Sequence, residues 1–370
     1  MRTPPRIAFD VAAAGALALA LPGLWLAPAV FFASWLAAWW FCIGVVLGLA
    51  ANVLVGTLTG GRWNDALLLV ARPAARALPW LLAAFLPLAA GLARLYPWAA
   101  DPSGAWTRGI EHPGFQLAWY RPGFFWARMA LIAIVWLLAA RPAAFARGGR
   151  AAAALVGIAL TGTLAAVDLL MSLTPGWVST GFGLVTMAGG AVGGVALANL
   201  VLAAWAPVRF PAPRVRPAHA TQPPVWRDLG NLQLTWTLLW AYLAFVEFLI
   251  IWAEDLPREI AWFVPRLQTG WVGIGLALAA GQFALPLVAL LWRSNKDAPH
   301  RLARLAAWQL AGQLVNCAWL VLPSIAPHAM PGWWLVPLLA LAIGLPAFGR
   351  IVHAVGSSSS RTAAPEVSHA

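Results

Sequence analysis

The sequence is poor in charge, and above all in acidic residues. Only 10% of its 370 residues are charged, with 12 Asp and Glu against 24 Lys and Arg, while 62% are hydrophobic. A soluble domain cannot hide that much apolar surface. The composition therefore excludes a soluble domain and predicts a polytopic membrane protein.

Ligands for redox groups are also scarce. The two cysteines, Cys42 and Cys317, lie in distant apolar runs, which excludes an iron–sulfur or c-type haem site. A haem buried in a helix bundle needs paired axial histidines within the membrane. Five of the six histidines lie in loops or in the tail, and His353 ends the last apolar run. With no P-loop and no metal-ligand spacing either, we expect a polypeptide that carries no electrons itself.

Long apolar runs are what the sequence has instead. Each is about the length that crosses a hydrocarbon core, so the fold class we expect is all-α with about ten transmembrane helices. The first run is not followed by a small-residue cleavage site, so we interpret it as a retained helix and not as a signal peptide. The expected spans are 7–26, 29–56, 77–96, 123–140, 151–172, 181–205, 228–252, 269–292, 303–323 and 333–355.

Basic residues gather in every second loop, which predicts that both termini are cytoplasmic. The net charge of +12 is explained by this asymmetry and does not indicate a nucleic-acid partner. The 24 Trp suit anchoring rings at the two membrane interfaces. In the alternate loops, Arg258 and Arg266 are balanced by Glu254, Asp255 and Glu259. The basic loops hold Arg2 and Arg6; Arg62, Arg72 and Arg76; Arg141, Arg147 and Arg150; Arg209, Arg214, Arg216 and Arg227; Arg293, Lys296, Arg301 and Arg304; Arg350 and Arg361.

A faint internal repeat relates the two halves of the chain. Asn52, in Leu-Ala-Ala-Asn-Val-Leu-Val, corresponds to Asn199, in Leu-Ala-Asn-Leu-Val-Leu, and at the same offset Gly123 corresponds to Gly270. Spans two to five would then repeat as spans six to nine in parallel topology. The alternative is chance similarity between helices rich in Ala, Leu and Gly.

Two acids lie at membrane depth in the predicted outer half. Glu247 lies 19 residues after Asp228, which is roughly 28 Å along a helix. Asp168 falls near the outer end of the fifth span, and Arg128 lies about one turn inside the fourth on the same side. Because an unpaired charge in the bilayer is costly, we expect at least one of the two acids to pair with Arg128. For Asp168, a proton relay or substrate contact and a structural Arg partner are both open.

Polar residues recur at helical spacing along two of the spans. Such stripes either line a polar path or hold helices together by hydrogen bonds. The proton-transfer candidates are Asp168, Glu247, Arg128 and Tyr242. The polar lining candidates are Asp228, Asn231, Gln233, Ser172, Ser179, Gln309 and Gln313.

Three stretches resemble the F subunit of bacterial alternative complex III, a quinol:cytochrome c oxidoreductase. They are 168–183, 228–271 and Trp119-Tyr120-Arg121-Pro122-Gly123-Phe124-Phe125 with Arg128. That subunit belongs with the polysulfide reductase (NrfD-like) membrane subunits. The chain departs from the family at Glu247, where Gln is expected.

The resemblance implies two four-helix bundles with two flanking helices. It also implies a subunit of the bacterial inner membrane that has no cofactor of its own and supports quinone or quinol binding, or proton transfer. The implied partners are an NrfD-like quinol-binding subunit and iron–sulfur and c-type haem subunits. A secondary transporter, and an anchoring or assembly factor for a respiratory complex, are the alternatives.

We divide the chain into six parts on this basis. The parts are 1–28, a flanking helix; 29–205, the first bundle with the sixth span; 206–227, a cytoplasmic linker rich in Pro and Arg; 228–331, the remainder of the second bundle; 332–355, a flanking helix; and 356–370, a disordered tail.

Overall fold

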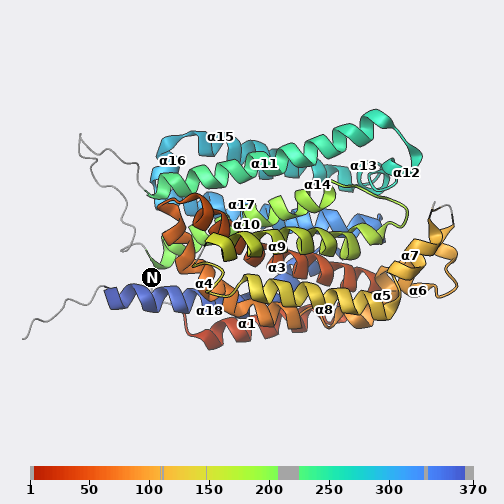
Figure 1. The fold of residues 1–370 in the computed structure, drawn as a ribbon, viewed down its shortest axis with the longest axis horizontal. Helices are drawn as coiled ribbons and strands as arrows, with labels where there is room; N and C mark the ends of the chain where they lie inside the picture. Colours follow the sequence, from red (N-terminus) through yellow and green to blue (C-terminus); the bar gives the residue numbers. More distant parts are fainter. Residues whose placement is uncertain are drawn as a thin grey trace, which may run out of the picture.

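In the computed structural model, the helices run roughly along the long axis of the molecule (Figure 1). The structure describes residues 4–108, 110, 112–146, 148–206, 225–328 and 332–362, with side chains as far as residue 357. These residues contain 10 helical segments long and apolar enough to cross a membrane. The prediction of an all-helical polytopic membrane protein with ten spans is confirmed at this level.

The ten spanning segments are joined by short helices at the two ends of the bundle. The spanning helices are α1 (Arg6–Ala20) with α2 (Pro22–Leu26), α3 (Pro28–Thr59), α4 (Trp63–Ala83), α8 (Pro122–Ala139), α9 (Gly148–Leu169) with η2 (Met171–Leu173), α10 (Phe182–Trp205), α11 (Val225–Glu254), α14 (Trp271–Leu278) with the π-helix η3 (Ala279–Ala284) and α15 (Leu285–Leu291), α17 (Pro299–Ile325) and α18 (Leu335–Thr362). The short helices are α5 (Leu88–Leu95), α6 (Pro97–Ala100), η1 (Ala105–Thr107), α7 (Pro113–Trp119), α12 (Pro257–Ile260), α13 (Val264–Leu267) and α16 (Arg293–Asp297).

The third span differs from its prediction. We expected it at 77–96, but α4 begins at Trp63, and a turn at 84–87 separates it from α5. One face of α4 is buried, whereas Arg72 and Arg76 are exposed. The prediction placed this span too late in the chain because it put the two arginines in a loop, whereas they lie on the exposed face of an amphipathic helix. The assignment of these two arginines to a loop was therefore wrong.

The centre of the bundle is the contact between α3 and α10, the two most buried spans. A Cβ on Gly48 would lie 2.0 Å from the carbonyl oxygen of Gly190, and one on Gly194 would lie 2.2 Å from the amide nitrogen of Leu49. The two backbones therefore touch, which only glycine allows at these positions. Small residues at helix contacts are typical of packing within membranes, where dispersion forces replace hydrophobic exclusion.

The first described helix begins and the last one ends at the same end of the molecule. The start of α1 and the end of α18 share this end, here called the terminal end, with α16; α7 and α12 lie at the opposite end, here called the far end (Figure 1). We expected disorder from Gly356, but α18 continues as a helix to Thr362. Residues 363–370, most of the linker at 207–224, and Arg147 lie outside the described residues.

Candidate functional site

A cavity of about 1150 Å³ opens at the far end of the bundle. Its wall comes from the connection between the third and fourth spans, from the end of the fifth span with the loop to the sixth, and from the loop after α11. Aromatic, hydroxyl and ionisable side chains share the wall, and the ionisable ones are Arg108, His112, Arg258 and Glu259. The aromatic and hydroxyl lining residues are Trp98, Trp106, Phe115, Trp119, Tyr120, Ser172, Thr174 and Trp177.

A buried ion pair lies directly beside this cavity. Arg128 Nε donates to Asp168 Oδ2 at 2.8 Å and Arg128 Nη2 donates to Asp168 Oδ1 at 3.2 Å, so the contact is bidentate. The side chains are 5% and 0% exposed. Trp119, which lines the cavity, donates its indole N–H to Asp168 Oδ1 at 2.8 Å. The predicted pairing of Arg128 with one of the two acids is confirmed, and the acid is Asp168.

Local folding explains how these three residues meet. α7 ends at Trp119, and Pro122 starts α8 two residues after Tyr120, where a proline is well suited to the first helical turn. The chain therefore turns back, so that Arg128 Nη1 donates to the carbonyl of Trp119 at 2.7 Å and the guanidinium lies 4.2 Å from the indole centroid. Asp168 lies in the last turn of α9 and meets Arg128 from there.

Stacked aromatic rings connect the pair to the cavity wall. Trp98 stacks between Tyr96, at 4.9 Å, and Tyr120, at 5.0 Å. The Trp98 indole donates to Ser172 Oγ at 3.3 Å, and that hydroxyl donates to the backbone carbonyl of Asp168 at 2.7 Å. Burial, and then the negative charge of Asp168, raises the pKa of Tyr120. Burial is also the main cause of the raised pKa of Tyr96. Both phenols are therefore hydrogen-bond donors at neutral pH.

The second acid, Glu247, lies in a different environment. Its carboxylate accepts a short hydrogen bond from the Ser179 hydroxyl. No cation pairs with it among the residues that the structure describes. Asp168 and Glu247 therefore have separate partners, and only Asp168 is neutralised by a fixed positive charge.

A chain of amides crosses the interior between α10, α11 and α17. Asn199 Nδ2 donates to Gln233 Oε1 at 2.5 Å, Gln233 donates in turn to Gln309, and Gln309 Nε2 donates to Thr237 Oγ1 at 2.7 Å. All four side chains are fully buried. Gln313 is next on α17 and contacts Asn316 at 3.5 Å. The predicted polar stripe therefore joins three helices.

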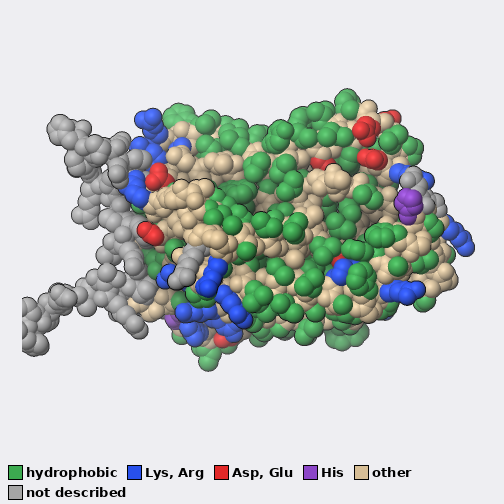
Figure 2. Space-filling model, in the orientation of Figure 1, with side chains coloured by type: hydrophobic (Ala, Val, Ile, Leu, Met, Phe, Trp, Pro, Cys, Tyr) green, Lys and Arg blue, Asp and Glu red, His purple; other side chains and the backbone are tan. Residues whose placement is uncertain are grey.

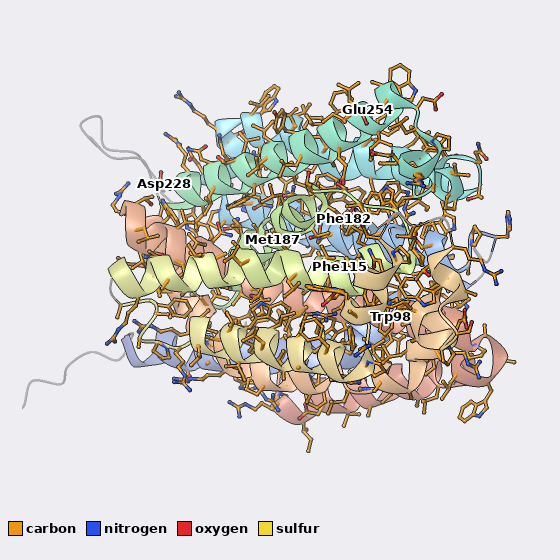
Figure 3. All side chains as sticks on the ribbon, turned by 45° about the vertical axis from the view of Figure 1, so that its right-hand side comes forward. Trp98, Phe115, Phe182, Met187, Asp228 and Glu254 are labelled. Carbon is orange, nitrogen blue, oxygen red and sulfur yellow. The ribbon has the colours of Figure 1, made fainter. Side chains whose placement is uncertain are left out.

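At the terminal end, α11 begins in a network of charges. Asp228 pairs with Arg62 at 3.5 Å, Arg227 pairs with Asp297, and Lys296 donates to Asn231 Oδ1 at 2.7 Å. Burial, and then the neighbouring Arg227, lowers the pKa of Lys296. Figure 3 shows that Asp228 and Glu254 mark the two ends of α11. Asp228 and Asn231 are thus far from the Arg128–Asp168 pair.

Tyr242, a proton-transfer candidate from the sequence, lies on the outer face of α11. Its side chain is 62% exposed. It does not line the far-end cavity or join the amide chain, since each of those is built from other described residues. Tyr242 therefore shares no site with the other proton-transfer candidates.

Sequence reasoning missed Arg266. We predicted that Arg266 lies in a loop, where nearby acids balance its charge. Its side chain is instead fully buried in α13 and donates to carbonyl oxygens. Its Nε donates at 3.2 Å to the Trp319 carbonyl, which has no helical partner because Pro323 lacks an N–H. The indole of Trp262 lies 3.4 Å from the guanidinium carbon. The sequence feature that could have revealed this role is Pro323 inside an apolar run, because a proline within a helix leaves the carbonyl four residues earlier without its backbone donor.

The fold and the site together define a polytopic helical membrane protein with a buried Arg–Asp pair beside an aromatic cavity. In the described ranges, no group of three or more His, Cys, Asp or Glu side chains could hold a metal ion. A scan against models of known protein families finds no match for this chain, and no curated protein matches it either.

Proposed function

We propose that this chain is a membrane subunit of a quinol:cytochrome c oxidoreductase similar to alternative complex III. It would support quinol binding, proton transfer or both at the outer side of the bacterial inner membrane, while partner subunits carry the haem and iron–sulfur groups. The observation that carries the proposal is the Arg128–Asp168 pair beside a far-end cavity with aromatic walls. Both residues fall in stretches that resemble the F subunit of that complex.

The environments of the two acids suggest different roles. A carboxylate held by a bidentate arginine is a stable fixed charge, so Asp168 would position Arg128 and Trp119 at the cavity wall. Glu247 has a hydroxyl partner and no paired cation in the described chain, so it can take up and release a proton without breaking an ion pair. Glu247 is therefore the proton carrier in this proposal.

The cavity suits a quinol headgroup by its chemistry. Partly exposed rings such as Trp106 and Phe115 provide stacking surfaces, and Thr174 provides a hydroxyl group that can bond a quinol oxygen. The residues would bind and orient such a molecule. The oxidation itself belongs to cofactors on other subunits.

The parallel repeat and the cytoplasmic termini are part of the same proposal. Asn52 and Asn199, which the repeat makes equivalent, are both buried on the central helices and both bond side chains of α11, Trp236 and Gln233 respectively. Under the positive-inside rule, the basic loops place the terminal end in the cytoplasm and the far-end cavity outside.

A secondary transporter is the second candidate. The π-helix η3 interrupts the eighth span, and the turn at 84–87 separates the third span from α5, and transporters also contain discontinuous helices. These two interruptions do not correspond under the repeat that relates Asn52 to Asn199. We therefore favour the respiratory subunit. A third candidate, an anchoring or assembly factor, would need surfaces that bind partner subunits but would leave the far-end cavity without a role.

Isolation of the tagged chain from its own membranes in mild detergent tests the proposal. The expected result is stoichiometric co-elution with c-type haem and iron–sulfur subunits, and loss of quinol:cytochrome c reductase activity when the chain is deleted. A control eluate, stripped of partners by high salt, should lack haem absorption. A chain that elutes alone from membranes with unchanged reductase activity would refute the proposal.

A further inference from the structure

Three arginines lie on the neighbouring helices α4 and α18, well inside the ends of these helices. Arg72, Arg76 and Trp80 follow one another at four-residue spacing, so they share a face of α4. The Trp80 indole donates to the carbonyl of Ile343 at 2.9 Å, which fixes this face against α18. Arg350 lies seven residues after Ile343, on the same side of α18.

The register of the two helices places the three arginines at one level. From the contact between Trp80 and Ile343, Arg76 lies roughly 6 Å and Arg72 roughly 12 Å toward the terminal end, at 1.5 Å per residue. Arg350 lies roughly 10 Å from the same contact in the same direction, because α18 runs antiparallel to α4. The three Cα atoms therefore fall in a layer about one helical turn thick.

These arginines lack protein counter-charges. All three are exposed, and in the part of the chain that the structure describes none of them forms an ion pair or a side-chain hydrogen bond. Asp65 lies two turns before Arg72 on α4, and Asp10 lies on α1, whose Phe9 packs on Phe348; neither acid forms an ion pair among the described residues. Figure 2 shows basic side chains gathered at the terminal end over α4 and α18.

We propose that Arg72, Arg76 and Arg350 form a binding site for the headgroup of an anionic phospholipid in the inner leaflet. Long arginine side chains inside a spanning helix extend to the headgroup layer, where a phosphodiester supplies the missing negative charge. Arginine binds phosphate with paired N–H groups, which a bound lipid would engage from two helices at once. Trp80, 38% exposed, lies on the membrane side of the site at the depth that suits an interfacial indole.

The site would join two helices of the bundle through one lipid. α18 packs on both α1 and α4, so a headgroup held by α4 and α18 lies over the seam that attaches the last helix to the first half of the chain. This inference concerns the terminal end. It is independent of the proposed role of the far-end cavity.

The test compares two variants of the full chain that each lose two positive charges. R72Q/R76Q removes the proposed site, and R301Q/R304Q removes an exposed pair from the start of α17 at the same end. Each is reconstituted in vesicles of phosphatidylcholine with phosphatidylglycerol and then extracted, and the bound phosphatidylglycerol is counted by native mass spectrometry. We expect about ten-fold weaker retention in R72Q/R76Q and little change in the control. Equal losses in both would show a general surface charge and overturn the site.

Two further measurements keep the result interpretable. R350Q alone should also reduce phosphatidylglycerol retention, and it serves if the double variant fails to fold. Inorganic phosphate in excess should not displace the lipid from the unaltered chain, because the acyl chains hold the headgroup at the helix surface. Displacement by free phosphate, or full retention in R350Q, would contradict the proposal.

Discussion

Replacing Asp168 with Asn tests the ion pair beside the cavity. The substitution keeps the shape of the side chain but removes its charge, and leaves the Arg128 guanidinium, 5% exposed, without a counter-ion. Breaking a buried pair by removing one partner costs about 3–5 kcal/mol. Arg128 keeps its bond to the Trp119 carbonyl and its contact with the indole ring, so we expect the lower end, about 3 kcal/mol.

The assay is reversible unfolding in mixed micelles, read as the free energy of unfolding. R128M is the partner variant, and we expect a smaller loss because Asp168 can take up a proton, whereas the arginine stays charged. The double variant should then lose less than the sum of the two single changes. A loss below about 0.5 kcal/mol in Asp168→Asn, or simple additivity in the double variant, would refute the reasoning.

The other predictions concern proton transfer and packing. E247Q should leave assembly intact and slow proton-coupled turnover about ten-fold, whereas E254Q, at the exposed end of the same helix, should not; equal rates would exclude Glu247 as the carrier. R266Q should destabilise by about 2 kcal/mol in the same unfolding assay, because the carbonyls that Arg266 binds lose their donors, and an unchanged stability would contradict this role. G48A should destabilise by at least about 1–3 kcal/mol, since its Cβ would meet a carbonyl oxygen at 2.0 Å; the control G15A has open space and should be neutral or stabilising.

The sequence by itself determined the number of spans and the pairing of Arg128 with an acid. Apolar length and the scarcity of charge define ten helices, because a bilayer accepts only helices with satisfied backbones from such runs. The pairing of Arg128 with an acid follows from the cost of an isolated charge at that depth. Pattern alone could not choose between Asp168 and Glu247, since both lie at a suitable depth.

Tertiary structure decided which partners meet. The turn between α7 and α8 brings Trp119 and Arg128 to Asp168, and the spacing of these residues in the sequence does not predict this contact. Helix packing turned Tyr242 outward and buried Arg266 against carbonyls that Pro323 leaves free. The physical reason is that periodicity defines which residues share a face of one helix, whereas the rotation and neighbours of that helix depend on contacts between residues far apart in the chain.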